Sequence, residues 1–196
     1  PALTRGGRHA EVSLFVIGLD GSRVAVPYDQ EYLVTAIWDA YGPAIVTLSR
    51  DQRSMRLLSV DPATGATEPL REDTDPAWVD IVSGVPARPS DGSLVWVADA
   101  DGGRRLIIGS DPVTPPSLQV RAVLDVDGDT VLFQASGEPT EIHLWTYAGG
   151  AISPVAMESG VYGGRRAGGV TLVTSQSLES EGTSITVIRP DGTAPS

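Results

Sequence analysis

The sequence predicts an all-β fold, a partial β-propeller of about four blades built from antiparallel four-stranded sheets. Short apolar strands joined by tight polar turns recur along the chain. The recurring sets are spaced about 40 residues apart, which is typical of one propeller blade per repeat. No segment shows the sustained 3.6-residue apolar periodicity of a helix. A β-sandwich also has regularly spaced strands, but it gives no reason for the turns to recur at the same place in each set.

The clearest repeat unit is a meander of three short strands. Ala44–Ser49 and Met55–Val60 are apolar strands separated by the polar turn Arg50-Asp51-Gln52. Asp61–Gly65 forms a second turn, in which proline and glycine suit the required backbone angles, and Ala66–Leu70 is the third strand. Strands this short bury too little apolar surface alone, so the unit must pack against copies of itself or onto a sheet.

The remaining strands follow the same pattern along the chain. They are expected at Glu11–Leu19, Arg23–Val26, Tyr32–Trp38, Trp78–Val82, Leu94–Ala98, Arg105–Ile108, Val120–Val126, Val131–Ala135, Ile142–Tyr147, Ile152–Ala156, Tyr162–Ala167, Val170–Thr174 and Thr183–Ile188. Prolines interrupt Val113–Leu118, so this segment is expected only at a sheet edge. Loops are expected at Asp73–Pro76 and Pro86–Asp91, and a closing turn at Asp191-Gly192.

These sets divide residues 1–196, read as one propeller fragment of a larger chain, into repeat units. The expected units are roughly 1–31, 32–72, 73–119, 120–158 and 159–196. Both ends of the sequence resemble cuts through a longer repeat, because it opens without Met and closes on a turn with no returning strand.

Composition excludes several classes of function. The formal net charge is −11 at pH 7, which disfavours nucleic acid and anionic membrane surfaces as partners. The chain has no cysteine, so disulfides, thiolate nucleophiles and cysteine metal sites are excluded. All basic residues are arginine, which we interpret as codon bias in a GC-rich bacterial genome. No apolar run is long enough to cross a membrane, and no signal peptide is visible. The missing leader favours the cytoplasm, but the compartment is left open because the chain resembles a truncated one.

The two histidines do not form a recognisable catalytic constellation. A Ser-His-Asp assembly needs the base within hydrogen-bond reach of the nucleophile, yet His9 and His143 lie on different repeats. His143 is expected to be a structural residue on a strand face, and His9 to lie solvated in a loop. The sequence also lacks the Gly-x-Ser-x-Gly pattern of a hydrolase nucleophile elbow.

Two further segments imitate ligand-binding motifs. Asp125–Asp129 resembles the opening of a calcium loop, but it lacks the distal bidentate carboxylate, and Asp-Gly is typical of a hairpin turn. Asp99–Gly103 has the same interpretation. Gly160–Gly169, with Arg165 and Arg166, could cradle a phosphate; since no helix follows, we interpret it as a flexible loop between strands.

Six segments follow one another in an order that matches a known family. They are His9–Leu14, Tyr32–Trp38, Leu48–Gln52, Thr74–Val79, Asp91–Trp96 and Glu138–Leu144. On these segments the chain resembles the N-terminal propeller of the dipeptidyl peptidase IV family of serine peptidases. The resemblance covers most of residues 9–150, and its weight comes from the order of the segments rather than from any single motif.

The resemblance implies a function for the chain. In that family an α/β-hydrolase domain with a Ser-Asp-His triad follows the propeller, and the enzyme removes N-terminal dipeptides, typically with proline second. The chain would correspond to the later blades, after the acidic pair that grips the substrate's amino terminus and before the triad. It would then be a non-catalytic segment without metal or cofactor, walling and gating the substrate cavity. Its expected partners are the hydrolase domain of the parent chain, a peptide substrate and a second copy in a homodimer.

The resemblance also places Trp78 and Asp80 near the family's active-site cavity, so both are candidate substrate-facing residues. The alternative for Trp78 is a core position between blades. Two other functions remain open: a stand-alone propeller that binds a protein or a glycan, and a calcium-bound propeller enzyme that uses the aspartate-rich turns.

Overall fold

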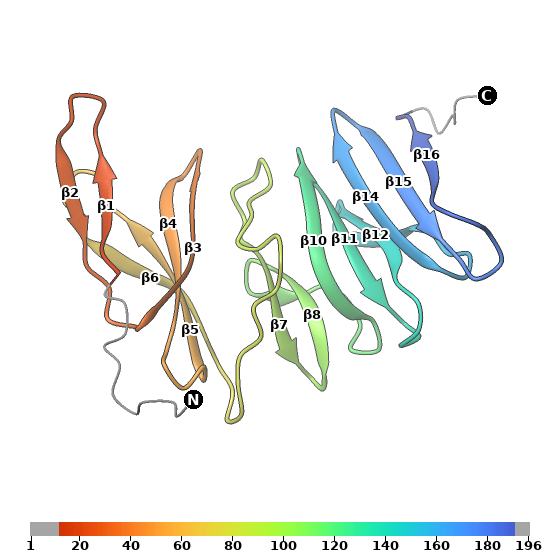
Figure 1. The fold of residues 1–196 in the computed structure, drawn as a ribbon, viewed down its shortest axis with the longest axis horizontal. Helices are drawn as coiled ribbons and strands as arrows, with labels where there is room; N and C mark the ends of the chain where they lie inside the picture. The colour runs from red at the N-terminus through yellow and green to blue at the C-terminus, as the bar shows by residue number, and fades with distance from the viewer. Residues whose placement is uncertain (1–11, 191–196) are drawn as a thin grey trace, which may run out of the picture. The chain divides into compact units, whose positions relative to one another are not determined.

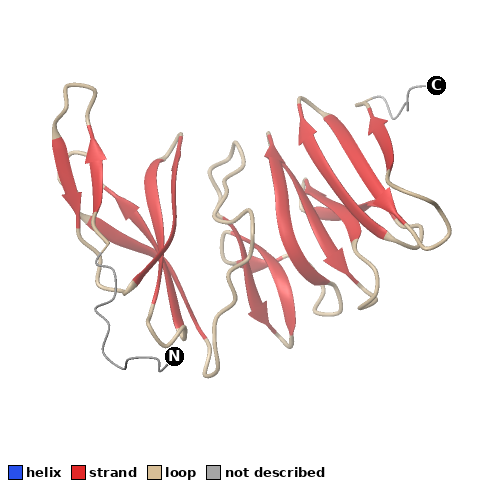
Figure 2. Ribbon diagram, viewed as in Figure 1, coloured by secondary structure: helices blue, strands red, loops and turns tan. Residues whose placement is uncertain are grey.

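The computed structural model describes residues 12–190 and contains strands, turns and loops but no helix in that range (Figures 1 and 2). Every strand pairs only with antiparallel neighbours within its sheet. The chain folds into two compact units, Pro1–Ile81 and Val82–Ser196. The predicted all-β class is therefore confirmed, and each unit can be described by itself.

The first unit contains one four-stranded sheet and one hairpin. The sheet has the order β3-β4-β5-β6, and β1 pairs with β2. The strands are β1 (Leu14–Ile17), β2 (Arg23–Val26), β3 (Tyr32–Asp39), β4 (Gly42–Leu48), β5 (Ser54–Val60) and β6 (Thr67–Thr74). Burial alternates along β1, so Leu14 and Val16 pack towards a core formed by Val26, Ile45, Leu58 and Val60. This alternation is what a strand with one buried face requires.

The second unit contains three sheets, of which only the middle one has four strands. The strands are β7 (Val95–Ala100), β8 (Gly103–Ile108), β9 (Asp111–Pro112), β10 (Gln119–Asp127), β11 (Thr130–Ser136), β12 (His143–Ala148), β13 (Ala151–Ala156), β14 (Val161–Ala167), β15 (Val170–Gln176) and β16 (Ser184–Ile188). The sheets are β7-β8-β9, β10-β11-β12-β13 and β14-β15-β16. An isolated bridge from Ala87 to Val95 adds one further antiparallel contact before β7.

Strand β11 shows how the sheets of the second unit stack. Val131, Leu132 and Phe133 are all fully buried, because the sheet β10–β13 has apolar neighbours on both faces. Val131 and Phe133 belong to a core shared with β7 and β8, whereas Leu132 belongs to a core shared with β14 and β15. A strand covered on both faces is expected to carry a continuous apolar run, and Val131–Phe133 is such a run.

Most of the predicted strands are confirmed within one to three residues. The strand expected at Glu11–Leu19 is shorter than predicted, and Glu11 itself, like His9 and the Asp191-Gly192 turn, lies outside the described residues. The loop expected from Asp73 is also displaced, because β6 continues to Thr74.

Three predictions are wrong. Trp78–Val82 is a loop rather than a strand, because its backbone is held by a turn of the neighbouring hairpin. Val113–Leu118 forms no strand, because Pro115 and Pro116 have no N–H groups to donate to a neighbouring strand. In addition, the N–H of Leu106 in β8 donates to the Thr114 hydroxyl at 3.0 Å rather than to a backbone carbonyl. Gly160–Gly169 is mostly strand β14 (Val161–Ala167) followed by the turn Gly168-Gly169, so the segment is not the loop that was expected.

Candidate functional site

The two residues predicted to face substrate, Trp78 and Asp80, lie in the loop after β6. The Trp78 side chain is 61% exposed and does not belong to the buried core of the first unit. Its indole Nε1 donates a hydrogen bond to Asp80 Oδ1 at 3.2 Å, which brings the two candidates together. The pair presents an aromatic ring beside a carboxylate, and both groups come from the first unit.

The loop takes its shape from Asp75. Asp75 Oδ1 accepts the backbone N–H of Ala77 at 2.7 Å and of Trp78 at 3.0 Å. An Asp-Pro pair favours such an Asx turn, and this was the sequence signal that could have identified the loop. The carboxylate therefore uses the backbone donors that a strand would have offered to a neighbour.

A second support for the loop is the turn between β4 and β5. The N–H of Val79 donates to the carbonyl of Gln52 at 2.7 Å, and the N–H of Asp75 donates to the carbonyl of Arg53 at 3.0 Å. Gln52 has a φ of 59°, a left-handed conformation that is uncommon outside glycine. The neighbouring Asp51 has a lowered pKa because the Ser49 hydroxyl and then the Arg53 N–H bond its carboxylate. These local bonds fix the turn on which the Trp78 loop rests.

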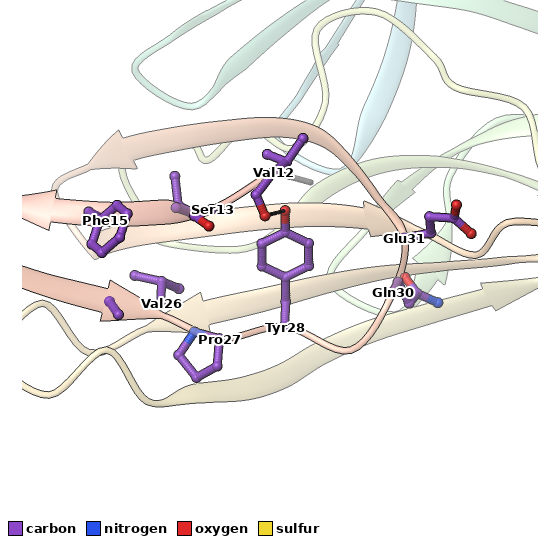
Figure 3. Close-up of a pocket in the computed structure, with 10 residues that line it drawn as sticks. Val12, Ser13, Phe15, Val26, Pro27, Tyr28, Gln30 and Glu31 are labelled. Atoms are coloured by element: carbon purple, nitrogen blue, oxygen red, sulfur yellow. Dashed lines mark hydrogen bonds between the residues drawn. The ribbon is translucent and has the colours of Figure 1, made fainter. Parts of the chain in front are cut away.

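A pocket of about 400 Å³ in the first unit was not predicted from the sequence (Figure 3). It is lined by β1, the end of β2 and the loop that follows β2. Tyr28 stands in this loop, and its hydroxyl donates to the carbonyl of Val12 at 3.4 Å (Figure 3). The lining residues are Val12, Ser13, Leu14, Phe15, Ala25, Val26, Pro27, Tyr28, Gln30 and Glu31.

Two side chains of the pocket loop fix it to the four-stranded sheet. Gln30 Nε2 donates to the carbonyl of Ser54 at 3.1 Å, and Gln30 Oε1 accepts the hydroxyl of the buried Thr47 at 2.6 Å. Glu31 pairs with Arg50 at 3.2 Å. Arg50 belongs to the same β4–β5 turn that holds the Trp78 loop, so the pocket loop and the Trp78 loop lie at one end of this sheet.

His143 lies in β12 and is only 6% exposed. Its Nε2 is 3.1 Å from the carbonyl oxygen of Glu158 and 3.3 Å from Glu141 Oε2. The hydroxyl of Ser159 donates to Glu141 Oε1 at 2.6 Å rather than to the imidazole. The serine thus contacts a carboxylate and not the histidine, so the three residues do not form the relay of a Ser-His-Asp nucleophile.

Tyr162 packs beside His143 in this cluster. Burial raises the pKa of Tyr162, and the carboxylates of Glu158 and Glu141 add to the effect. The His143 and Tyr162 rings are 5.9 Å apart and tilted. This packing matches the predicted role of His143 as a structural residue on a strand face.

The aspartate-rich turn and the glycine-arginine segment contact each other. Asp127 accepts the backbone N–H groups of Gly168 and Gly169, and Asp125 accepts the N–H of Arg166. The carboxylates that imitated a calcium loop are thus bound to the segment that imitated a phosphate cradle. Among residues 12–190, no group of three or more His, Asp or Glu side chains is arranged to hold a metal ion. The same range contains no helix long and apolar enough to cross a membrane.

Comparison with known proteins identifies the family. A model of the dipeptidyl peptidase IV (DPP IV) N-terminal region matches residues 5–161, which is most of the chain. The chain belongs to the DPP IV N-terminal region family. No curated protein sequence matches it.

Solved structures agree with this family in fold. A dipeptidyl peptidase 4 of Porphyromonas gingivalis superposes with a TM-score of 0.77 at 19% identity, covering 92% of this chain and 28% of that one. A Bacteroides ovatus protein described as a putative dipeptidyl aminopeptidase IV superposes with a TM-score of 0.68 at 14% identity, covering 89% of this chain and 30% of that one. The chain spans under a third of either protein. These likenesses show the fold, and the predicted partial propeller is confirmed.

The DPP IV N-terminal region match includes both Trp78 and Asp80, together with the loops that hold them. It ends at residue 161, where β14 begins, so the last sheet lies almost entirely beyond it. The predicted resemblance, which covered most of residues 9–150, is confirmed over that range.

Proposed function

We propose that the chain is a non-catalytic propeller segment of a DPP IV-like serine peptidase, in which it walls and gates the cavity that peptides enter. The observation that carries the proposal is the match to the DPP IV N-terminal region over residues 5–161. The sequence itself contains no Gly-x-Ser-x-Gly elbow. The nucleophile then belongs to an α/β-hydrolase domain elsewhere in the parent chain, and each predicted repeat unit corresponds to a blade or part of one.

Trp78 and Asp80 are the residues proposed to face the peptide. An exposed indole offers a flat apolar face on which a peptide side chain can pack, and the adjacent carboxylate can accept a peptide N–H. Asp75 and Gln52 hold the loop in place, so the ring is presented by a fixed backbone. Such contacts bind substrate and transition state alike, and removing them raises KM while leaving kcat unchanged.

The exposed apolar residues of the first unit fit a further partner. Phe15, Ile17 and Trp38 are exposed and line a groove of about 380 Å³ between β1 and the sheet β3–β6. A second copy of the parent protein in a homodimer is the proposed occupant, in addition to the hydrolase domain and the peptide.

The test replaces Trp78 in the longer gene product that contains this chain. With a Gly-Pro chromogenic substrate, Trp78→Ala is expected to raise KM about three- to tenfold with kcat within twofold, as for loss of one partly exposed aromatic contact. Asp80→Asn keeps the side-chain shape and is expected to raise KM less.

Tyr41→Ala is the matched control, since Tyr41 is also an exposed aromatic residue, at 56%, belongs to the same unit and does not line the apolar groove. Its KM is expected to stay at the wild-type value. Equal KM values for all three variants and the wild type would contradict the substrate-facing role. A longer gene product that has no hydrolase domain would instead favour a stand-alone propeller that binds a protein or a glycan.

A further inference from the structure

Two carboxylates of β10 bind the hairpin formed by β14 and β15, at residues that lie 41 or 42 positions later in the chain. Asp127 Oδ2 accepts the N–H of Gly169 at 2.7 Å, and Asp127 Oδ1 accepts the N–H of Gly168 at 3.1 Å. Both glycines have positive φ, 57° and 80°, so their consecutive N–H groups form a concave anion-binding turn. One carboxylate therefore fills a turn that could otherwise hold a free anion.

The adjacent arginines reinforce this contact. The N–H of Arg166 donates to Asp125 Oδ2 at 2.9 Å, and Arg165 Nη1 donates to the carbonyl of Leu124 at 3.0 Å. Arg166 Nε is buried and lies 3.5 Å from Asp127 Oδ2, while its Nη1 donates to Thr171 at 2.7 Å. Hydrogen bonds with an ionised partner are about twice as strong as neutral ones, so the set holds the hairpin firmly.

The apolar contact between these two sheets is small by comparison. Its buried core consists of Leu132, Leu144, Tyr162 and Val173, whereas ten buried residues join the sheet β10–β13 to the elements before it. Val170, Leu172 and Ile185 are more than a third exposed, but they alternate with the buried Thr171 and Val173 and so lie on the opposite face of the last sheet. The hydrogen bonds of Asp125 and Asp127 therefore supplement a small buried core in the docking of this sheet.

We propose that Asp125 and Asp127 form an electrostatic latch that docks the sheet β14–β16 onto the sheet β10–β13, and that the last sheet undocks as a unit when the latch opens. The hairpin is held at the latch end by the two carboxylates. At the other end of β14 it is held by backbone bonds between Ile142 and the segment Gly160–Tyr162. Opening the latch leaves β10–β13 folded, because the larger core on its opposite face is unaffected. This electrostatic latch does not depend on the proposed function of the chain.

The test is amide hydrogen exchange, followed by mass spectrometry, of the 196-residue chain. Asp127→Asn replaces one acceptor oxygen by a donor and removes the charge, so peptides from 161–188 are expected to exchange about tenfold faster or more. Peptides from 119–136 are expected to change less than twofold. Asp129→Asn is the matched control, because it makes the same charge change in the same turn, and no hydrogen bond or ion pair of its carboxylate is found among residues 12–190.

A second measurement on the wild-type chain covers the case in which Asp127→Asn does not fold. Raising NaCl from about 0.05 to about 1 M screens the latch and is expected to accelerate exchange in 161–188 more than in 119–136. Equal acceleration in both sheets, by the variant or by salt, would overturn the proposal, as would an Asp127→Asn profile equal to that of Asp129→Asn.

Discussion

Two glycine turns of this protein touch the neighbouring sheet, but they do so by different means. In the first unit, the β5–β6 turn places Gly65 against the carbonyl of Ala25 in β2, and a Cβ at Gly65 would lie only 1.9 Å from that oxygen. In the second unit, the β14–β15 turn places Gly168 and Gly169 against the carboxylate of Asp127. The first contact is steric and the second is electrostatic.

The aspartates near these turns differ in the same way. Asp61 folds back on its own turn, accepting the N–H of Ala63 at 2.8 Å and the hydroxyl of Thr64 at 2.7 Å. Asp127 instead reaches a turn of another sheet. The comparison shows that one residue type can stabilise a turn locally or join two sheets, depending on which donors lie within its reach. The loss of stability caused by a substitution at the Gly65 turn should therefore not depend on salt concentration, whereas the loss caused by a substitution at the Gly168-Gly169 contact should.

The largest effect is expected at Gly65. Gly65→Ala adds a methyl group where φ is +78° and where the Ala25 carbonyl leaves no room. The left-handed backbone costs about 1–2 kcal/mol and the overpacking about 1–3 kcal/mol more, so the first unit is expected to lose about 4 kcal/mol of stability. Denaturant unfolding measures the loss of stability, and hydrogen exchange of the amides in β2 and β6 shows whether the loss is located at this turn.

Gly21→Ala separates the two causes. Gly21 has a similar φ of +82° in the same unit, yet nothing lies within 4 Å of the added Cβ. Only the backbone cost remains, about 1–2 kcal/mol. If Gly65→Ala cost no more than Gly21→Ala, the close approach of this turn to β2 would have no energetic weight.

A smaller effect is expected in the titration of Asp61. The Thr64 hydroxyl and then the Ala63 N–H lower the pKa of this carboxyl below its ordinary value of 3.8. A carboxyl with a lowered folded-state pKa contributes stability above its unfolded value, and that contribution is lost as pH falls through the folded value. Thr64→Ala is expected to raise the pKa of Asp61 towards 3.8, measured by NMR of the side-chain carboxyl carbon.

The carboxyl of Asp91 serves as the internal reference in that titration. Its pKa is lowered by the hydroxyl and N–H of Ser93, in a turn that Thr64 does not touch. If Thr64→Ala left the pKa of Asp61 unchanged, the hydrogen bond from the Thr64 hydroxyl to the Asp61 carboxylate would not be present in solution.

The sequence predicted the strands well where turns and alternation agreed. The strand Arg23–Val26 has the predicted bounds because Asp20-Gly21 and Pro27 limit it on both sides. The prediction failed at Trp78–Val82, where apolar residues indicated a strand. There the Asp75 side chain and the Gln52 carbonyl took the backbone N–H groups instead. Short apolar runs next to an Asp-Pro pair are ambiguous for this reason.

The contacts between distant segments could not be predicted from local pattern. Asp125–Asp129 and Gly160–Gly169 each resemble a separate ligand motif, although each binds the other. Their meeting depends on the register of β10 and on which hairpin packs beside it, and neither is written in a turn or a strand pattern. Trp78 and Asp80 were named as candidates by resemblance, although their hydrogen bond was not predicted, and the pocket around Tyr28 carried no motif at all.

The most direct test of the proposed function compares peptidase activity in two forms of the protein. A Gly-Pro chromogenic substrate is incubated with the 196-residue chain and with the longer gene product read from the codons on both sides of it. We expect turnover by the longer product and none by the chain, together with a downstream Gly-x-Ser-x-Gly followed by Asp and then His. Turnover by the chain alone, or a longer product without a hydrolase domain, would contradict the proposed function.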